Sequence, residues 1–115
     1  MSEVIKKKST IEIEVGLNEN NVPQEIKWTA EDGKVSQEEA RAMLLALWDP
    51  RSKNTMKIDL WTTEMSVEEM KVFFHQTLLT MADTFEKATG EQAISEDLRD
   101  YCFHFAEKMN IMPES

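Results

Sequence analysis

The sequence of 115 residues predicts an α+β fold, with strands in the first half and two helices at the C-terminal end. Two segments, 11–17 and 56–60, alternate apolar and polar residues, which is the period of a half-buried strand. From Ser66 onward, apolar residues recur every three to four positions, which is the period of an amphipathic helix. A chain of this length holds one sizeable core, so we expect a single domain over residues 1–115.

Composition and charge exclude several classes of protein. An apolar content of 41%, with eight methionines and three tryptophans, argues against disorder. The formal net charge of −9 argues against binding to nucleic acid or to an anionic membrane, and the basic run 6–8 is too short to reverse it. No stretch approaches the roughly 20 apolar residues of a membrane span, so we expect no direct membrane insertion. The lone Cys102 and the lack of an apolar leader predict a cytoplasmic location.

The first half of the chain predicts a β-hairpin that follows a flexible tail at 1–7. In segment 11–17 the β-branched residues share one face, while Glu12 and Glu14 face water. Polar residues 18–23 form a turn, and segment 24–30 returns with Ile26 and Trp28 in phase. The two segments are expected to place their apolar faces on one core.

Segment 36–48 allows two interpretations. Ser36 and Glu39 have the spacing of a helical capping box, and the apolar residues that follow fall at helical spacing. The alternative pairs segment 42–49 with segment 55–62 as a hairpin across the turn-forming run 50–54. Residue chemistry alone leaves this choice open, because tertiary pairing often overrides local propensity.

The last third of the chain predicts two helices. Ser66 and Glu69 form a capping box, and Gly90 supplies a left-handed stop after about residue 89. A second helix is expected after Ser95. The first helix carries an apolar stripe made of Val67, Met70, Phe74, Leu78, Met81, Phe85 and Ala88.

No motif indicates catalysis or metal binding. Cys102 and His104 lie two residues apart on a predicted helix, so their side chains point in different directions and cannot share a metal. His75 adds no third ligand at fixed spacing. Four carboxylates, those of Glu12, Glu14, Asp49 and Asp59, could meet on a sheet face, but solvated strand faces are the commoner explanation. We therefore expect no catalytic residue, no cofactor and no metal site.

The strand pairing decides which way the tryptophans face. If Asp49 lies opposite Met56, Trp48 shares the face of Trp61; if Asp49 lies opposite Thr55, Trp48 turns toward the core. Trp61 falls on the polar side of its own strand, where it could cover a neighbouring strand or anchor a partner. The second interpretation predicts a protein-binding patch made of Trp61, Trp48, Leu44, Asp59 and Lys57.

Three stretches form a recognisable combination: Glu-Asn-Asn-Val-Pro-Gln-Glu-Ile-Lys-Trp (19–28), Leu-Trp-Asp (47–49) and Lys-Asn-Thr-Met-Lys-Ile-Asp-Leu-Trp-Thr-Thr-Glu-Met-Ser-Val-Glu-Glu-Met-Lys (53–71). Together they resemble the gliding-motility protein GldC family of gliding bacteria. The resemblance covers nearly the whole chain and weakens after about Gly90. It favours a strand at 42–47, although family members tend to have branched and small residues where this chain has Leu and Met.

With this resemblance the expected fold is ββββαα: a four-stranded, mostly antiparallel sheet over 8–62, then two helices over 66–112 packed on one face. The resemblance implies a non-enzymatic, cytoplasmic accessory protein of gliding motility that binds protein partners of the gliding machinery. A homodimer is a second candidate assembly, because a flat sheet face can be self-complementary. The alternative function is an acidic holding chaperone similar to SecB, which also runs four strands then two helices; this is an analogy of topology only.

Overall fold

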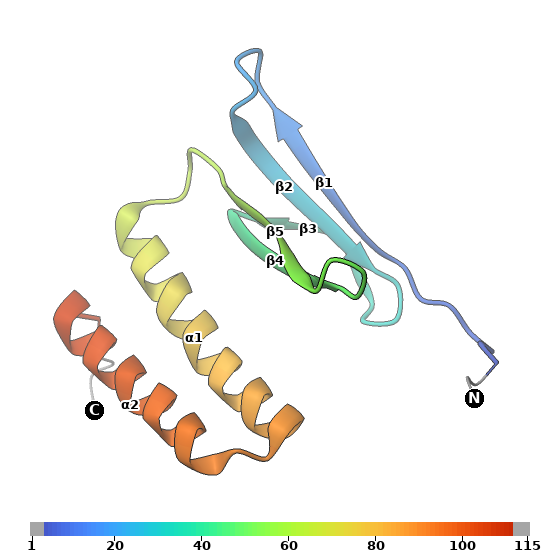
Figure 1. The fold of residues 1–115 in the computed structure, drawn as a ribbon. Coiled ribbons are helices and arrows are strands. Elements are labelled where there is room, and N and C mark those ends of the chain that lie inside the picture. Colours follow the sequence, from blue (N-terminus) through green and yellow to red (C-terminus); the bar gives the residue numbers. More distant parts are fainter. Residues whose placement is uncertain (1–3, 112–115) are drawn as a thin grey trace. The chain divides into compact units, whose positions relative to one another are not determined.

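The computed structural model describes residues 4–111 and confirms the α+β class (Figure 1). Within them the strands are β1 (Ile11–Leu17), β2 (Pro23–Ala30), β3 (Val35–Ala40), β4 (Ala42–Asp49) and β5 (Asn54–Trp61), and the helices are α1 (Val67–Thr89) and α2 (Gln92–Met109). These strands form two sheets, β1-β2-β3 and β4-β5, rather than the expected single sheet of four strands. The chain divides at Met65 into a unit that holds the strands and a unit that holds the helices.

The three-stranded sheet has the apolar face that alternation predicts. Ile13 lies opposite Trp28 and Val15 opposite Ile26, so the apolar residues of β1 and β2 share one face. Ile26 is fully buried and also lies opposite Ala40 of β3. The predicted tail lies before this sheet; its residues 4–7 belong to no strand or helix, and residues 1–3 lie outside the described part.

The expected single sheet omits β3, and the helical interpretation of segment 36–48 is wrong. Ser36 and Glu39 do not cap a helix; both lie in β3, where Glu39 is paired with Lys27 of β2. The backbone of Gln37 is left-handed, with φ of 52°, and its N–H donates to the Thr29 hydroxyl at the irregular part of the ladder. Pairing with β2 therefore overrides the local helical signals.

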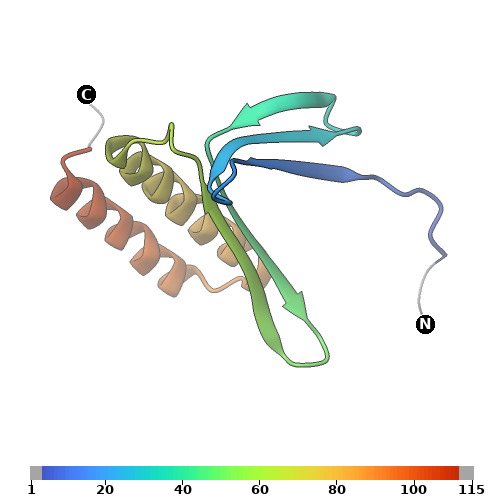
Figure 2. The same ribbon diagram turned by 90° about the horizontal axis from the view of Figure 1, so that it is seen from above.

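The strand expected at 42–49 is confirmed as β4, and only Arg41 separates it from β3. The base of the β4-β5 hairpin is closed by Thr62, whose N–H and hydroxyl both donate to the Arg41 carbonyl, at 2.8 and 3.1 Å. Thr62 is buried with its hydrogen bonds made. Figure 2 shows this long hairpin in green, from β4 through the turn into β5.

The helical unit is an antiparallel pair in which α1 and α2 lie side by side (Figures 1 and 2). Ala82 on α1 and Cys102 and Ala106 on α2 are buried. The Arg99 guanidinium of α2 binds the carboxylates of Asp83 and Glu86 on α1, at 2.9 and 2.7 Å. Small buried side chains and the ion pairs of Arg99 thus join the two helices.

The ends of α1 match the prediction, but the start of α2 does not. Ser66 and Glu69 form the capping box, and Gly90 is left-handed with φ of 74°. α2 begins at Gln92 rather than after Ser95, whose buried hydroxyl donates to the Glu91 carbonyl inside the first turn. Packing of both helices on one sheet face stays a prediction.

Candidate protein-binding surface

The turn of the β4-β5 hairpin is organised by Asp49. Its carboxylate accepts hydrogen bonds from the Ser52 hydroxyl at 2.8 Å and from the Arg51 N–H at 3.1 Å. The Lys53 N–H donates to the Asp49 carbonyl, and Lys53 is left-handed with φ of 58°. The hydrogen bond from the Ser52 hydroxyl, and then that from Arg51, hold the pKa of Asp49 below its ordinary value. A charged Asp49 therefore stabilises the turn.

The register of the hairpin puts Asp49 opposite Asn54, which is neither of the two expected partners. Asn54 lies two residues from Met56, so the faces are those of the first alternative. One face, here called the Trp face, consists of Ala42, Leu44, Ala46, Trp48, Thr55, Lys57, Asp59 and Trp61. The five predicted binding residues all belong to it.

The Trp face does not bring its two tryptophans together. Trp61 lies opposite Ala42 at the base of the hairpin, and Trp48 lies opposite Thr55 next to the turn. These two positions are six residues apart on β4, which corresponds to about 20 Å along the strand. Leu44 lies opposite Asp59 between them, and Lys57 lies opposite Ala46. One hairpin therefore carries two separate aromatic side chains, not a compact patch.

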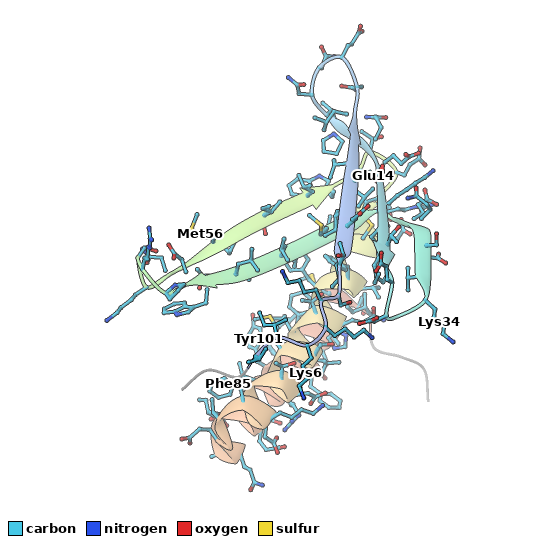
Figure 3. All side chains as sticks on the ribbon, turned by 90° about the vertical axis from the view of Figure 1, so that its right-hand side faces the viewer. Lys6, Glu14, Lys34, Met56, Phe85 and Tyr101 are labelled. Atoms are coloured by element: carbon cyan, nitrogen blue, oxygen red, sulfur yellow. The ribbon has the colours of Figure 1, made fainter. Side chains whose placement is uncertain are left out.

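Both tryptophans are exposed, Trp48 by 65% and Trp61 by 59%, and Leu44 is exposed as well. The opposite face, here called the Leu face, consists of Met43, Leu45, Leu47, Asp49, Asn54, Met56, Ile58 and Leu60. The alternation in segment 56–60 predicts a half-buried strand, whose apolar side faces a core. Leu47 and Met56, however, are each exposed by 59%, and Figure 3 labels Met56 toward the turn end of the hairpin.

The sheet topology separates the four carboxylates that the sequence could have placed on one sheet face. Glu12 and Glu14 belong to β1 of the three-stranded sheet, while Asp59 belongs to the β4-β5 sheet, and Asp49 lies on the Leu face of the hairpin. The four carboxylates therefore do not share one sheet face. The charges beside the tryptophans on the hairpin itself are those of Lys57 and Asp59.

Cys102 and the two histidines belong to the helical unit, whereas the hairpin belongs to the strand unit. Cys102 is buried in the helical unit, and burial raises the pKa of its thiol. The ring of His75 stacks on Phe105, and the ring of His104 lies beside Tyr101. Within residues 4–111, no three His, Cys, Asp or Glu side chains are grouped to hold a metal ion. Neither helix of this range has the length and hydropathy to span a membrane.

The fold is that of a small α+β protein with a β-hairpin that exposes apolar side chains on both faces. A family model described as gliding motility-associated protein GldC-like matches residues 23–111. The chain belongs to this GldC-like family, which is associated with gliding motility, as the three motifs indicate. No curated protein and no solved structure matches the chain.

Proposed function

We propose that this chain is a non-enzymatic accessory protein of bacterial gliding motility that acts in the cytoplasm by binding another protein through the Trp face of the β4-β5 hairpin. The family supplies the association with gliding. The observation that supports the binding surface is the exposure of Trp48 and Trp61 on one face beside Lys57 and Asp59. Exposed tryptophan bordered by charge is the usual anatomy of a binding anchor.

The charge of the chain defines the kind of partner that fits. With 22 acidic and 13 basic residues, the chain carries a formal net charge of −9. A partner surface rich in Lys and Arg is therefore favoured, and its association should weaken as salt increases. We propose a basic protein of the gliding machinery as this partner.

Truncation of one anchor tests the proposal. Trp61→Ala is expected to leave the fold intact, since the side chain is exposed, and to weaken the complex by about 2 kcal/mol or more, roughly thirtyfold in Kd. The matched control is Phe103→Ala, because Phe103 on α2 is exposed by 62%, close to the 59% of Trp61. Affinity purification from a gliding bacterium, followed by titration of the recovered machinery protein, measures both variants.

The control separates a specific anchor from general apolar contact. The proposal holds if gliding components are recovered with wild type and Phe103→Ala but lost with Trp61→Ala. Equal recovery with all three proteins would refute the Trp face as the docking surface. Unfolding of Trp61→Ala, seen by circular dichroism, would instead make Trp61 a structural residue.

The amount of exposed apolar surface favours one other function, that of a holding chaperone. Apolar side chains are exposed on both faces of the hairpin and also along α1, where Val67 and Met81 are among them. Such extended surface suits an unfolded client, whereas an adaptor needs a folded partner. Binding of a reduced, permanently unfolded polypeptide, compared with the same polypeptide in its native form, distinguishes the two functions.

A further inference from the structure

The outer edge of β4 is the least protected strand edge in the described part of the chain. β4 pairs with β5 on one side, and no described strand pairs with its other side. The remaining edge strands all carry charge: Glu12 and Glu14 on β1, Glu38 and Glu39 on β3, and Lys57 and Asp59 on β5. From Ala42 to Trp48, β4 has no charged residue, no proline and no glycine. Proteins normally block such an edge, because it is a template for pairing with another chain.

The hydrogen bonding of the hairpin shows which residues of β4 present their backbone outward. The Thr62 N–H donates to the Arg41 carbonyl, so these two residues form a hydrogen-bonded pair in the register of the hairpin. Bonded and non-bonded pairs alternate along an antiparallel ladder. The N–H and carbonyl groups of Ala42, Leu44, Ala46 and Trp48 therefore point away from β5, toward the open edge.

We propose that β4 pairs antiparallel with β4 of a second copy of this chain, about a two-fold axis at Leu45. In this register the outward-facing residues of one copy meet those of the other, as the hydrogen bonds require. Ala42 lies opposite Trp48 of the second copy, and Leu44 lies opposite Ala46. Each large side chain thus faces a small one across the new ladder, so two large side chains do not compete for the same space.

Charge supports the same register. The residues that flank the apolar stretch, Arg41 and Asp49, lie opposite each other between the two copies, so opposite charges meet at both ends. A shift by one pair in one direction sets Trp48 opposite Ala40, which belongs to β3 of the other sheet, so Trp48 loses its partner on β4. A shift in the other direction sets Pro50, which has no N–H to donate, opposite Ala42. A closed two-fold pairing also removes the exposed edge from further association.

The pairing would complete the Trp face. Across the joined four-stranded sheet, Trp61 and Ala42 of one copy fall in one row with Trp48 of the second copy. The two tryptophans, about 20 Å apart along one hairpin, then lie two strand spacings apart, about 10 Å, with only an alanine between them. The dimer stands apart from the proposed function, but the role of this joined surface in partner binding rests on it.

A cysteine on the two-fold axis tests the register. The two copies of Leu45 would form a non-hydrogen-bonded pair, with Cα atoms about 4.5 Å apart, within the range of a disulfide. Leu45→Cys should therefore form a disulfide-linked dimer with oxidised glutathione, read on a non-reducing gel. Wild type should not, because Cys102 is buried.

Met43→Cys is the matched control on the same face of β4. In the proposed register the two copies of Met43 are offset by four residues, about 13 Å along the strand, and cannot be bridged. Met43→Cys should stay monomeric on the gel alone, yet cross-link when mixed with Leu47→Cys. A Leu45→Cys protein that fails to cross-link, or a Met43→Cys protein that cross-links as well, would overturn the register.

Two proline variants test the edge itself. Ala46→Pro removes an outward N–H of β4, whereas Lys57→Pro makes the same change on the strand directly opposite, at the outer edge of β5. Neither N–H is used between β4 and β5. Light scattering should give a dimer for wild type and Lys57→Pro, and a dimer Kd raised at least about tenfold for Ala46→Pro, which loses two bonds per dimer.

A monomeric wild type, or equal dimers from both proline variants, would refute pairing through β4. Trp61 lies on β5, outside the paired edge, so Trp61→Ala should still dimerise. Loss of partner binding with the dimer retained concerns the proposed function, whereas loss of the dimer in Ala46→Pro concerns the pairing. The two results can therefore be separated.

Discussion

Ser66 and Gly90 show how far single residues determine the helical unit. The Ser66 hydroxyl accepts from the Glu69 N–H at 3.0 Å, and the Glu69 carboxylate accepts from the Ser66 N–H at 3.1 Å. Both ends of α1 could be predicted from the sequence because their signals lie within a few residues of one another. The start of α2 could not, since Glu91 makes no side-chain cap and Ser95 bonds backward instead of capping.

Loss of the Ser66 side-chain cap is expected to destabilise the fold by a measurable amount. Ser66→Ala should lower the free energy of unfolding by about 1 kcal/mol, because a helical N–H loses its acceptor. Urea denaturation measures the loss. Thr80→Ala, in the middle of α1 where no cap is involved, is the control and should change stability by less than about 0.5 kcal/mol.

The turn carboxylate predicts a response to acid. The pKa of Asp49 is lower in the folded chain than in the unfolded chain. Its charge therefore stabilises the fold at pH values above the pKa of the unfolded chain, and this contribution disappears as the pH falls below about 4. Asp49→Asn should therefore be less stable than wild type at pH 7, and the difference should shrink at pH 2–3. A constant difference across this range, measured by urea denaturation, would show that the charge of Asp49 is irrelevant.

At the scale of elements, alternation and pairing had different predictive value. β1, β2 and β5 could be predicted because apolar and polar residues alternate along most of each strand. β3 could not, since its sequence Val-Ser-Gln-Glu-Glu-Ala is mostly polar and is held by pairing with β2. β4 was ambiguous because Leu, Met and Ala suit a helix equally well, and only the family resemblance favoured a strand.

The buried contact between α1 and α2 makes a prediction for the helix pair. Ala82 is completely buried, so Ala82→Leu should force the helices apart and cost about 1–3 kcal/mol. Ala88→Leu is the control, because Ala88 is exposed on the same helix and the same change there should be nearly neutral. Thermal unfolding of both variants, followed by circular dichroism, tests the order.

For the whole molecule, the sequence could predict which side chains of the hairpin share a face but not how far they lie apart. The residues of the Trp face could be predicted because every second residue of a strand points to the same face. The distance between Trp48 and Trp61 depends on where the hairpin begins and ends. The exposure of Leu47 and Met56 on the Leu face could not be predicted either. Alternation shows which residues share an apolar face, but not whether another element packs against that face.

The length of the chain predicts a single domain, and the positions of its three tryptophans allow this prediction to be tested. Trp28, Trp48 and Trp61 all lie in the strand unit, whereas both helices lie in the other unit. Tryptophan fluorescence therefore reports on one unit, and ellipticity at the helical wavelength reports mainly on the other. Coincident urea transitions are expected for a single cooperative domain; two separated midpoints would show that the units unfold independently.

The short turn at Asp49 also has a consequence for biosynthesis. β4 leaves the ribosome unpaired and without charge from Ala42 to Trp48, and its partner strand β5 is complete only when the turn and β5 itself, residues 50–61, have been added. At ordinary rates of translation these twelve or so residues take about one to two seconds, whereas a hairpin closes within microseconds. The interval in which the nascent β4 can aggregate is therefore set by the speed of the ribosome over residues 50–61 and not by the speed of folding.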